Sequence, residues 1–240
     1  MHQETRVNPT RRQILGAGLA VLGSAALFWP FRVLADPAPE KSKEAGEGIA
    51  PPEDLMREHG VLRRILLIYE ELHRRLQNKV AFGPEVLSGS AVIIKKFIEE
   101  YHEKLEEDFL FPRFAQAGKL VDLVAVLIVQ HWAGRKVTDF LLANAKAENL
   151  KDPKMRQGLA AHLHAFCRMY RPHAAREDTV LFPALRTIVP AREFQEMGEK
   201  FEDIEQEKFG KNGFEKIVAE VAGLEKALGI EDLAQFTPKS

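Results

Sequence analysis

The sequence of 240 residues lacks several features that mark common functional classes. It has a single cysteine, Cys167, which excludes an intrachain disulfide, a CxxC redox pair, a thiolate zinc site and a cysteine-held iron–sulfur cluster. It also lacks an excess of basic charge, because 34 lysines and arginines stand against 35 aspartates and glutamates. Binding to nucleic acid by counterion release needs such an excess, so we expect no nucleic-acid partner. Any bound metal must have histidine, aspartate, glutamate or tyrosine ligands.

Residues 1–35 differ from the rest of the chain and predict an export signal. A polar start and the adjacent arginines Arg11 and Arg12 precede an apolar stretch that reaches about Phe28, and small residues precede Asp36. This layout resembles a twin-arginine signal, so we expect export to the periplasm or the cell exterior by the twin-arginine machinery. An uncleaved membrane anchor is the alternative, although the apolar stretch is shorter than the ~20 residues that span a bilayer.

The segment 36–52 is rich in proline, lysine, glutamate and glycine, has almost no apolar residues, and predicts a flexible linker. The twin-arginine route carries folded proteins, often with a cofactor already inserted, so a metal or organic cofactor is expected. If the leader is removed, the mature chain is mildly acidic and we expect no membrane contact.

From residue 53 onward the sequence predicts an all-helical fold. Apolar residues recur at helical spacing, strong helix formers dominate, and no stretch shows the two-residue alternation of strands. Long helices joined by short connections form an up-down-up-down bundle, here over residues 53–188. The four bundle helices are predicted at 53–79, 88–117, 120–148 and 154–188. Two further amphipathic helices, 191–209 and 213–228, are expected outside the bundle, in a C-terminal extension over 189–240.

One motif occurs twice, in the second and in the fourth predicted helix. His102 and Glu106, four residues apart, are followed by Leu-Phe-Pro, and the same pattern recurs in the same register from His173. Each preceding helix holds one matching histidine, because His59 lies 43 residues before His102 and His131 lies 42 before His173. The chain therefore contains two copies of one helix pair.

The repeated positions form a candidate set of metal ligands. A histidine and a carboxylate four residues apart project from one helix face, so two such helices would place Glu106 and Glu177 between two metal ions. Exposed ion pairs are the alternative, but apolar neighbours place the histidines in the core, where unpaired ionisable groups are costly. Nitrogen and oxygen ligands of this kind suit iron or manganese. The candidate ligands are His59, His102, Glu106, His131, His173 and Glu177.

The order H, HxxxE, H, HxxxE, with Leu-Phe-Pro after each HxxxE, resembles the hemerythrin-like (HHE cation-binding) family over residues 53–188. The resemblance implies a four-helix bundle around a non-haem di-iron centre that binds O2 or related small ligands in an apolar pocket. It assigns one iron to His59 and His102, the other to His131 and His173, and the bridges to Glu106 and Glu177. The residues expected to line the pocket are Leu62, Leu66, Phe109, Leu127, Ile128 and Val180.

One departure from the family lies in the third bundle helix. The best-known hemerythrins have a fifth histidine four residues after the position of His131, where this chain has Arg135. The resemblance is therefore to the four-histidine branch, whose additional open metal position favours redox turnover over reversible O2 carriage. We expect Arg135 to form a salt bridge with Glu106, Glu107 or Glu177 or, as the alternative, to hydrogen-bond a bound peroxide or anion.

Two other residues leave alternatives open within the same ligand set. Tyr170, one turn before His173, is expected in the core, with metal ligation as the alternative. Asp178 occupies the position of the bridging aspartate in the best-known hemerythrins, whereas Glu177 has the spacing seen in the second helix. We favour Glu177 as the bridge.

Two rival metal sites are also weighed. The motifs Glu70-x-x-His73 and Glu99-x-x-His102 are typical of a ferritin-like carboxylate site, but that site uses other helices of a bundle. Glu70, His73 and His162 are predicted to lie together toward one end of the bundle, where they could form a second, weaker metal site. Capped or solvated histidines are the simpler expectation there.

The leading functional hypothesis is an exported di-iron protein that binds O2, peroxide or nitric oxide outside the cytoplasm and can turn one of them over. Turnover would need electrons from a donor that the sequence does not identify. A non-enzymatic module that stores or senses O2 or iron is the second hypothesis. A structural interaction domain held together by zinc is the third.

Overall fold

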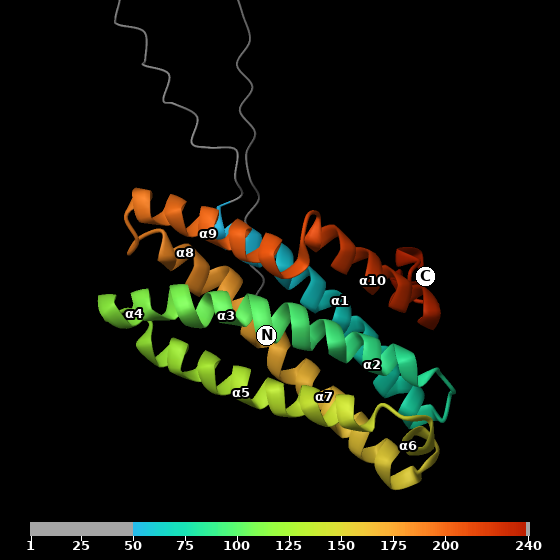
Figure 1. Ribbon diagram of the computed structural model, residues 1–240. Helices are drawn as coiled ribbons and strands as arrows, with labels where there is room; N and C mark the ends of the chain where they lie inside the picture. The colour runs from blue at the N-terminus through green and yellow to red at the C-terminus, as the bar shows by residue number, and fades with distance from the viewer. Residues whose placement is uncertain (1–49, 239–240) are drawn as a thin grey trace, which may run out of the picture. The chain divides into compact units, whose positions relative to one another are not determined.

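The computed structural model describes residues 50–238, and all regular structure in this range is helical (Figure 1). This confirms the all-helical fold class. The predicted export signal and nearly all of the predicted linker lie outside the described residues. Among residues 50–238, none of the helices combines the length and the apolar character that a bilayer crossing requires.

The first bundle helix, α1 (Pro51–Asn78), begins where two prolines and two acids favour a helix start. It ends at Lys79, whose φ of 58° is left-handed. The second bundle helix runs without a break over residues 84–117 and ends at Gly118, which has a φ of 63°. Its parts are α2 (Pro84–Ile93), the π-helical η1 (Ile94–His102), α3 (Glu103–Leu105), the π-helical η2 (Glu106–Leu110) and α4 (Phe111–Ala117).

The third bundle helix is α5 (Val121–Asn144), which ends earlier than the predicted residue 148 because a short separate helix, α6 (Ala147–Lys151), follows it. Asp152 then caps the fourth bundle helix by accepting a 2.6 Å hydrogen bond from the Met155 amide. This fourth helix consists of α7 (Pro153–Arg176), the π-helical η3 (Glu177–Leu181) and α8 (Phe182–Leu185).

Two longer helices follow the bundle, α9 (Ala191–Phe209) and α10 (Gly213–Leu228), with the bounds that the sequence predicts, and a short 3-10 turn, η4 (Leu233–Phe236), comes last. Both pack on the outside of the bundle, against α1 and the second bundle helix (Figure 1). Phe97 and Tyr101 contact the Phe209 ring of α9, at 5.5 and 5.2 Å between centroids, and Phe97 also contacts Phe214 of α10, at 6.3 Å.

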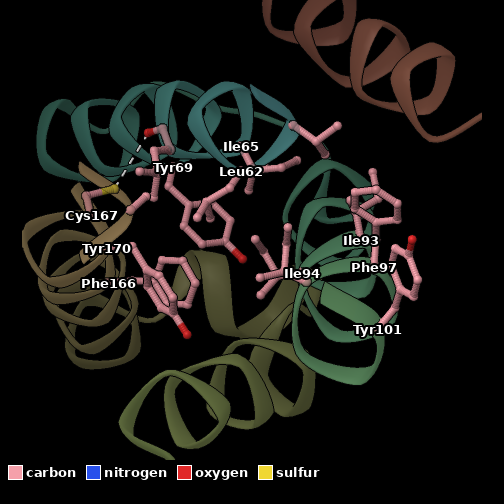
Figure 2. Close-up of a cluster of buried hydrophobic side chains, with 14 of the residues drawn as sticks. Leu62, Ile65, Tyr69, Ile93, Ile94, Phe97, Tyr101, Phe166, Cys167 and Tyr170 are labelled. Carbon is pink, nitrogen blue, oxygen red and sulfur yellow. Dashed lines mark hydrogen bonds between the residues drawn. The ribbon is translucent and has the colours of Figure 1, made fainter. Parts of the chain in front are cut away.

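The main core lies between the four bundle helices, each of which contributes apolar side chains. Figure 2 shows Leu62, Ile65 and Tyr69 of α1 and Phe166 and Tyr170 of α7 pointing toward the bundle axis. Cys167 is 5% exposed and its thiol lies 3.6 Å from the Leu66 carbonyl oxygen. The cysteine is thus a small buried residue of the core.

Both copies of Leu-Phe-Pro produce the same irregularity in the helix. Pro112 has no amide hydrogen, and the amide of Phe111 bonds the Glu106 carbonyl five residues back instead of four. Phe182 bonds the Glu177 carbonyl in the same way. A residue five positions after each glutamate therefore turns to the same face as the glutamate, which an α-helix would not allow.

Candidate metal centre

The six predicted ligands come together as two groups in the bundle interior. In each group, every residue offers one nitrogen or oxygen within 4.8 Å of those of the other two. All six side chains are buried, with at most 4% of any residue exposed. The His59 triad consists of His59, His102 and Glu106, and the His131 triad consists of His131, His173 and Glu177.

The histidines of each triad point their Nε2 atoms at each other. The Nε2 atoms of His59 and His102 are 3.1 Å apart, and those of His131 and His173 are 3.2 Å apart. Two nitrogens bound to one metal at about 2.1 Å and a right angle are separated by about 3 Å. Each nitrogen pair therefore has the spacing of two ligands of one metal ion.

The two glutamates lie between the nitrogen pairs and turn one oxygen toward each of them. Glu106 places Oε1 3.7 Å from His102 Nε2 and Oε2 3.5 Å from His131 Nε2. Glu177 does the same with the other two histidines, at 3.4 Å from His59 and 3.1 Å from His173. Each carboxylate can therefore bridge two metal ions.

The electrostatics of this interior favour a cation. All four oxygens of Glu106 and Glu177 are buried without a hydrogen-bond partner. Burial, the Glu177 charge and the Glu103 charge raise the pKa of Glu106 well above its usual range. Burial would also raise the pKa of Glu177, but His173 and His59 bring it below its ordinary value. Burial and the neighbouring His59 lower the pKa of His102, which keeps its ring neutral and able to bind a metal.

Each histidine of the two triads also has an acceptor for its other ring nitrogen. An acceptor on Nδ1 fixes the hydrogen there and leaves the lone pair of Nε2 directed into the site. Three of the four acceptors are carboxylates. The Nδ1 contacts are His59 with Asp178 (2.6 Å), His102 with Glu58 (2.6 Å), His131 with Glu107 (3.0 Å) and His173 with Gln130 (2.8 Å).

Sequence reasoning missed these acceptors, although a simple signal was available. Glu58 and Gln130 each precede the first histidine of a copy, and Glu107 and Asp178 each follow the glutamate of a triad. The acceptor role of Asp178 also bears on the choice of bridge. Its carboxylate contacts the outer nitrogen of His59, whereas both oxygens of Glu177 face the inner nitrogens.

An arginine four residues after each first histidine holds one of the acceptors. Arg63 contacts Asp178, and Arg135 donates to Glu107 at 2.7 Å. Arg135 also lies 2.8 Å from the buried carboxylate of Glu103. The salt bridge expected for Arg135 is therefore formed, with Glu107 among the glutamates considered. These contacts place its charge beside the acceptor of His131.

The two phenylalanines of the Leu-Phe-Pro copies line the site, which the sequence analysis did not predict. Phe111 stacks on His131 at 5.7 Å and Phe182 on His59 at 5.5 Å between ring centroids. The five-residue turns described above bring them to this face. Val180 was wrongly expected in the pocket, because the same turn rotates it outward and leaves it 42% exposed.

The other residues expected in the pocket have two different environments. Leu62, Leu66 and Leu127 are buried, whereas Phe109 and Ile128 are half-buried. The Phe109 ring packs against Phe201 of α9, 5.5 Å between centroids, because it lies on the outer face of its helix.

Tyr170 lies in the core, as the simpler expectation held. Its hydroxyl donates a 2.6 Å hydrogen bond to Glu103 Oε1. Burial and the neighbouring Glu103 charge raise its pKa well above the usual range, which opposes a phenolate ligand.

The rival sites are not assembled in the described part of the chain. The Nδ1 atoms of His73 and His162 contact the carbonyl oxygens of Ala160 and Gly158, at 2.9 and 2.8 Å. Glu70 pairs with Arg171 at the surface. Within residues 50–238, the candidate metal-holding groups include none of Glu70, Glu99, His73 or His162.

Comparisons with known proteins agree with this arrangement. Residues 122–229 match the model of the hemerythrin HHE cation binding domain. Uncharacterized proteins of Mycobacterium bovis and of two strains of Mycobacterium tuberculosis are 52% identical over 200 residues, which is 83% of this chain and 78% of theirs. Residues 122–229 of the chain therefore form a hemerythrin HHE cation-binding domain. No solved structure matches the chain.

The hemerythrin-like match starts and ends later than the range 53–188 inferred from the motifs. It runs from α5 to α10 and therefore contains the His131 triad but not the His59 triad. A domain of this kind implies metal binding, typically of iron. The paired triads supply the buried nitrogen and carboxylate ligands that such binding requires.

Proposed function

We propose that the two triads hold two iron ions, that Glu106 and Glu177 bridge them, and that this di-iron centre binds O2 or a related small ligand such as peroxide or nitric oxide. One observation carries the proposal: each of two buried glutamates turns one oxygen to each of two histidine pairs. Six ionisable groups without such a cation would leave the interior with unpartnered charge.

The donor set fits a reactive rather than a closed metal centre. Each ion would receive two histidine nitrogens and one oxygen from each bridging glutamate, which leaves room for a small ligand. Bound iron would supply the redox chemistry. The four-histidine ligand set, with Arg135 engaged by Glu103 and Glu107, supports turnover of the ligand over simple carriage.

The surrounding side chains would prepare this centre in three ways. The acceptors on the histidine Nδ1 atoms orient the rings and increase their basicity. Phe111 and Phe182, stacked on a histidine of each copy, exclude water from the site. The buried leucines Leu62, Leu66 and Leu127 keep the interior apolar, which suits O2 and nitric oxide.

Metal analysis of the purified protein tests the proposal directly. We expect two irons per chain and absorption bands that change when the protein is reduced and then exposed to O2. The double variant His102→Ala/His173→Ala should lose both the iron and the bands. His73→Ala/His162→Ala is the matched control, since those two histidines contact backbone carbonyls, and it should keep both.

Iron that persists in the first double variant would refute the assignment, and zinc in place of iron would favour a structural role. Turnover and storage are then separated by kinetics. Sustained consumption of peroxide or nitric oxide with an added reductant supports turnover. A stable oxygenated form that releases O2 on degassing would instead support storage or sensing.

We also propose that the protein acts outside the cytoplasm after export by the twin-arginine route. The pattern around Arg11 and Arg12, followed by the apolar stretch, supports this. Fractionation of cells that express the full chain tests it. Arg11→Lys/Arg12→Lys should keep the protein in the cytoplasm, whereas Arg6→Lys, a matched change outside the pair, should not. Export that is indifferent to the double variant would refute the route.

A further inference from the structure

The second bundle helix carries buried acids that the ligand set does not use. Glu99 is 2% exposed and Glu103 is 1% exposed. Both oxygens of Glu99 lack a hydrogen-bond partner, whereas Glu103 is bonded by the Tyr170 hydroxyl and by the Arg135 guanidinium. Such groups are costly to bury and need an explanation.

The repeat shows that the ligands themselves do not require these acids. Glu99 lies three residues before His102 and Glu103 one residue after it, and the corresponding positions around His173 are Tyr170 and Ala174. The second copy builds its triad without an acid at either position. The acids of the first copy therefore serve a purpose other than holding the histidines.

Glu99, Glu103 and Glu107 follow one another four residues apart on one helix, between a cavity and the His131 triad. Glu99 and Arg135 line a cavity of about 530 Å³ between the second bundle helix, α5 and α9. Arg135 lies 2.8 Å from Glu103, and Glu107 contacts His131 Nδ1 at 3.0 Å. A row of charged side chains thus runs from the cavity to the His131 triad.

At the end of this row nearest the His131 triad, three side chains could together bind a metal ion. Glu103, Glu107 and His131 each offer a ligand atom within 4.8 Å of the others, which makes a third group able to hold a metal ion. The Arg135 guanidinium bonds both of its carboxylates, at 2.8 and 2.7 Å. The Arg135 guanidinium therefore occupies the position between Glu103 and Glu107 where a metal ion could bind transiently.

We propose that Glu99, Glu103 and Glu107 form a loading path along which a divalent metal ion moves from the cavity to the His131 triad. The arriving ion displaces the Arg135 guanidinium from the carboxylates of Glu103 and Glu107. This inference rests on the proposed di-iron centre. Lys95, 3.3 Å from Glu99 and 3.0 Å from Asp139, balances the outer end of the path in the same way. Each arriving ion then exchanges with a side-chain cation, so that the acids are never left without a positive partner.

The test follows metal uptake by the metal-free full-length protein with Co²⁺ as the probe, without O2. Ligation by histidine and carboxylate gives Co²⁺ visible bands, whose growth in a stopped-flow instrument reports the rate of loading. Glu99→Gln and Glu103→Gln keep the shape of the side chain and remove its charge. We expect each to slow loading about tenfold, the size of an electrostatic focusing effect, without changing the final amount bound.

Glu100→Gln is the matched control, because Glu100 lines the same cavity but its side chain is 42% exposed and pairs with Lys96. Loading by this variant should stay within about twofold of the unchanged protein, since exposed charges are screened. Equal rates for all variants would overturn the path. So would a lower final amount in Glu103→Gln without slower uptake, which would make Glu103 a holding ligand.

Arg135→Gln tests separately whether the metal ion has to displace the Arg135 guanidinium. Without the competing guanidinium, loading should become faster while the final amount stays the same. Slower loading with a normal final amount would contradict this role. If the unchanged protein binds no metal at its triads, the di-iron proposal fails instead, and the two failures are thereby distinguished.

Discussion

The two copies of the helix pair build the same inner site and differ one layer further out. Both have a first histidine with an arginine four residues later, a second histidine with a bridging glutamate, and a stacked phenylalanine. The next layer is repeated only in part. The first histidines, His59 and His131, both have a carboxylate acceptor held by an arginine, but Glu58 accepts from His102, whereas the neutral Gln130 accepts from His173. The two copies therefore differ in charge beside their second histidines.

The cavities beside the two copies differ in the same sense. Beside Glu99 and Arg135 the larger cavity is edged by acids and lysines. Between α1 and α7 a cavity of about 280 Å³ is lined by Leu66, Tyr170 and Ala174, with two arginines at its edge. One cavity is therefore lined by charges of both signs, and the other mainly by apolar side chains on the helix that carries His173.

Of the single substitutions, removal of the Glu106 carboxylate should reduce the metal content most. Glu106 faces both histidine pairs, so Glu106→Ala should cost the protein both metal ions. His59 serves one pair, and His59→Ala should cost one ion while the His131 triad keeps the other. Metal analysis after dialysis measures both. If Glu106→Ala loses only one ion, as His59→Ala does, Glu106 does not bridge.

The two arginines should differ in their effect on stability by about 2 kcal/mol or more. The Arg135 side chain is 25% exposed and pairs with the buried Glu103, so Arg135→Ala leaves a buried charge and should cost about 3 kcal/mol. The Arg63 side chain is 49% exposed, and Arg63→Ala should cost less than about 1 kcal/mol. Urea unfolding of the metal-free proteins gives both values. A similar cost for both would mean that burial does not distinguish them.

The helices, and the six residues that the two triads bring together, could be predicted from the sequence for one physical reason. Helical periodicity and the spacing of His102 and Glu106 depend on local geometry, which repeats every turn regardless of the rest of the fold. The motif copies then indicated which helices face each other. The bounds of α9 and α10 followed from glycine and proline at their ends.

The outer contacts could not be derived in the same way, because they depend on the π-helical turns. An α-helix places Val180 near the histidine face, but the missing amide of Pro183 shifts the register and brings Phe182 there instead. The pairing of Asp178 with His59 likewise joins the first and last bundle helices. Only the packed bundle fixes such contacts between distant segments.

Substitution of the residues that accept hydrogen bonds from the histidine Nδ1 atoms should have smaller effects, which distinguish the metal affinities of the two triads. Removing an acceptor releases the ring and typically lowers metal affinity about 10–100-fold. We expect Glu58→Ala to weaken the His59 triad and Gln130→Ala to weaken the His131 triad. Competition with a chelator measures each affinity. Loss at the wrong triad, or at both equally, would contradict the paired contacts.

The smallest expected effect isolates the charge of one acceptor. Glu58→Gln keeps an acceptor for His102 Nδ1 and makes this position match Gln130 of the other copy. A carboxylate strengthens the histidine as a donor more than an amide does, because a charged partner gives the stronger hydrogen bond. We therefore expect stepwise metal titration to resolve two unequal affinities in the unchanged protein and nearly equal ones in the variant, with a change of less than about tenfold. If the two affinities stay as far apart in Glu58→Gln, the inequality comes from Glu103 and Arg135 beside the His131 triad, and Glu103→Gln should then remove it.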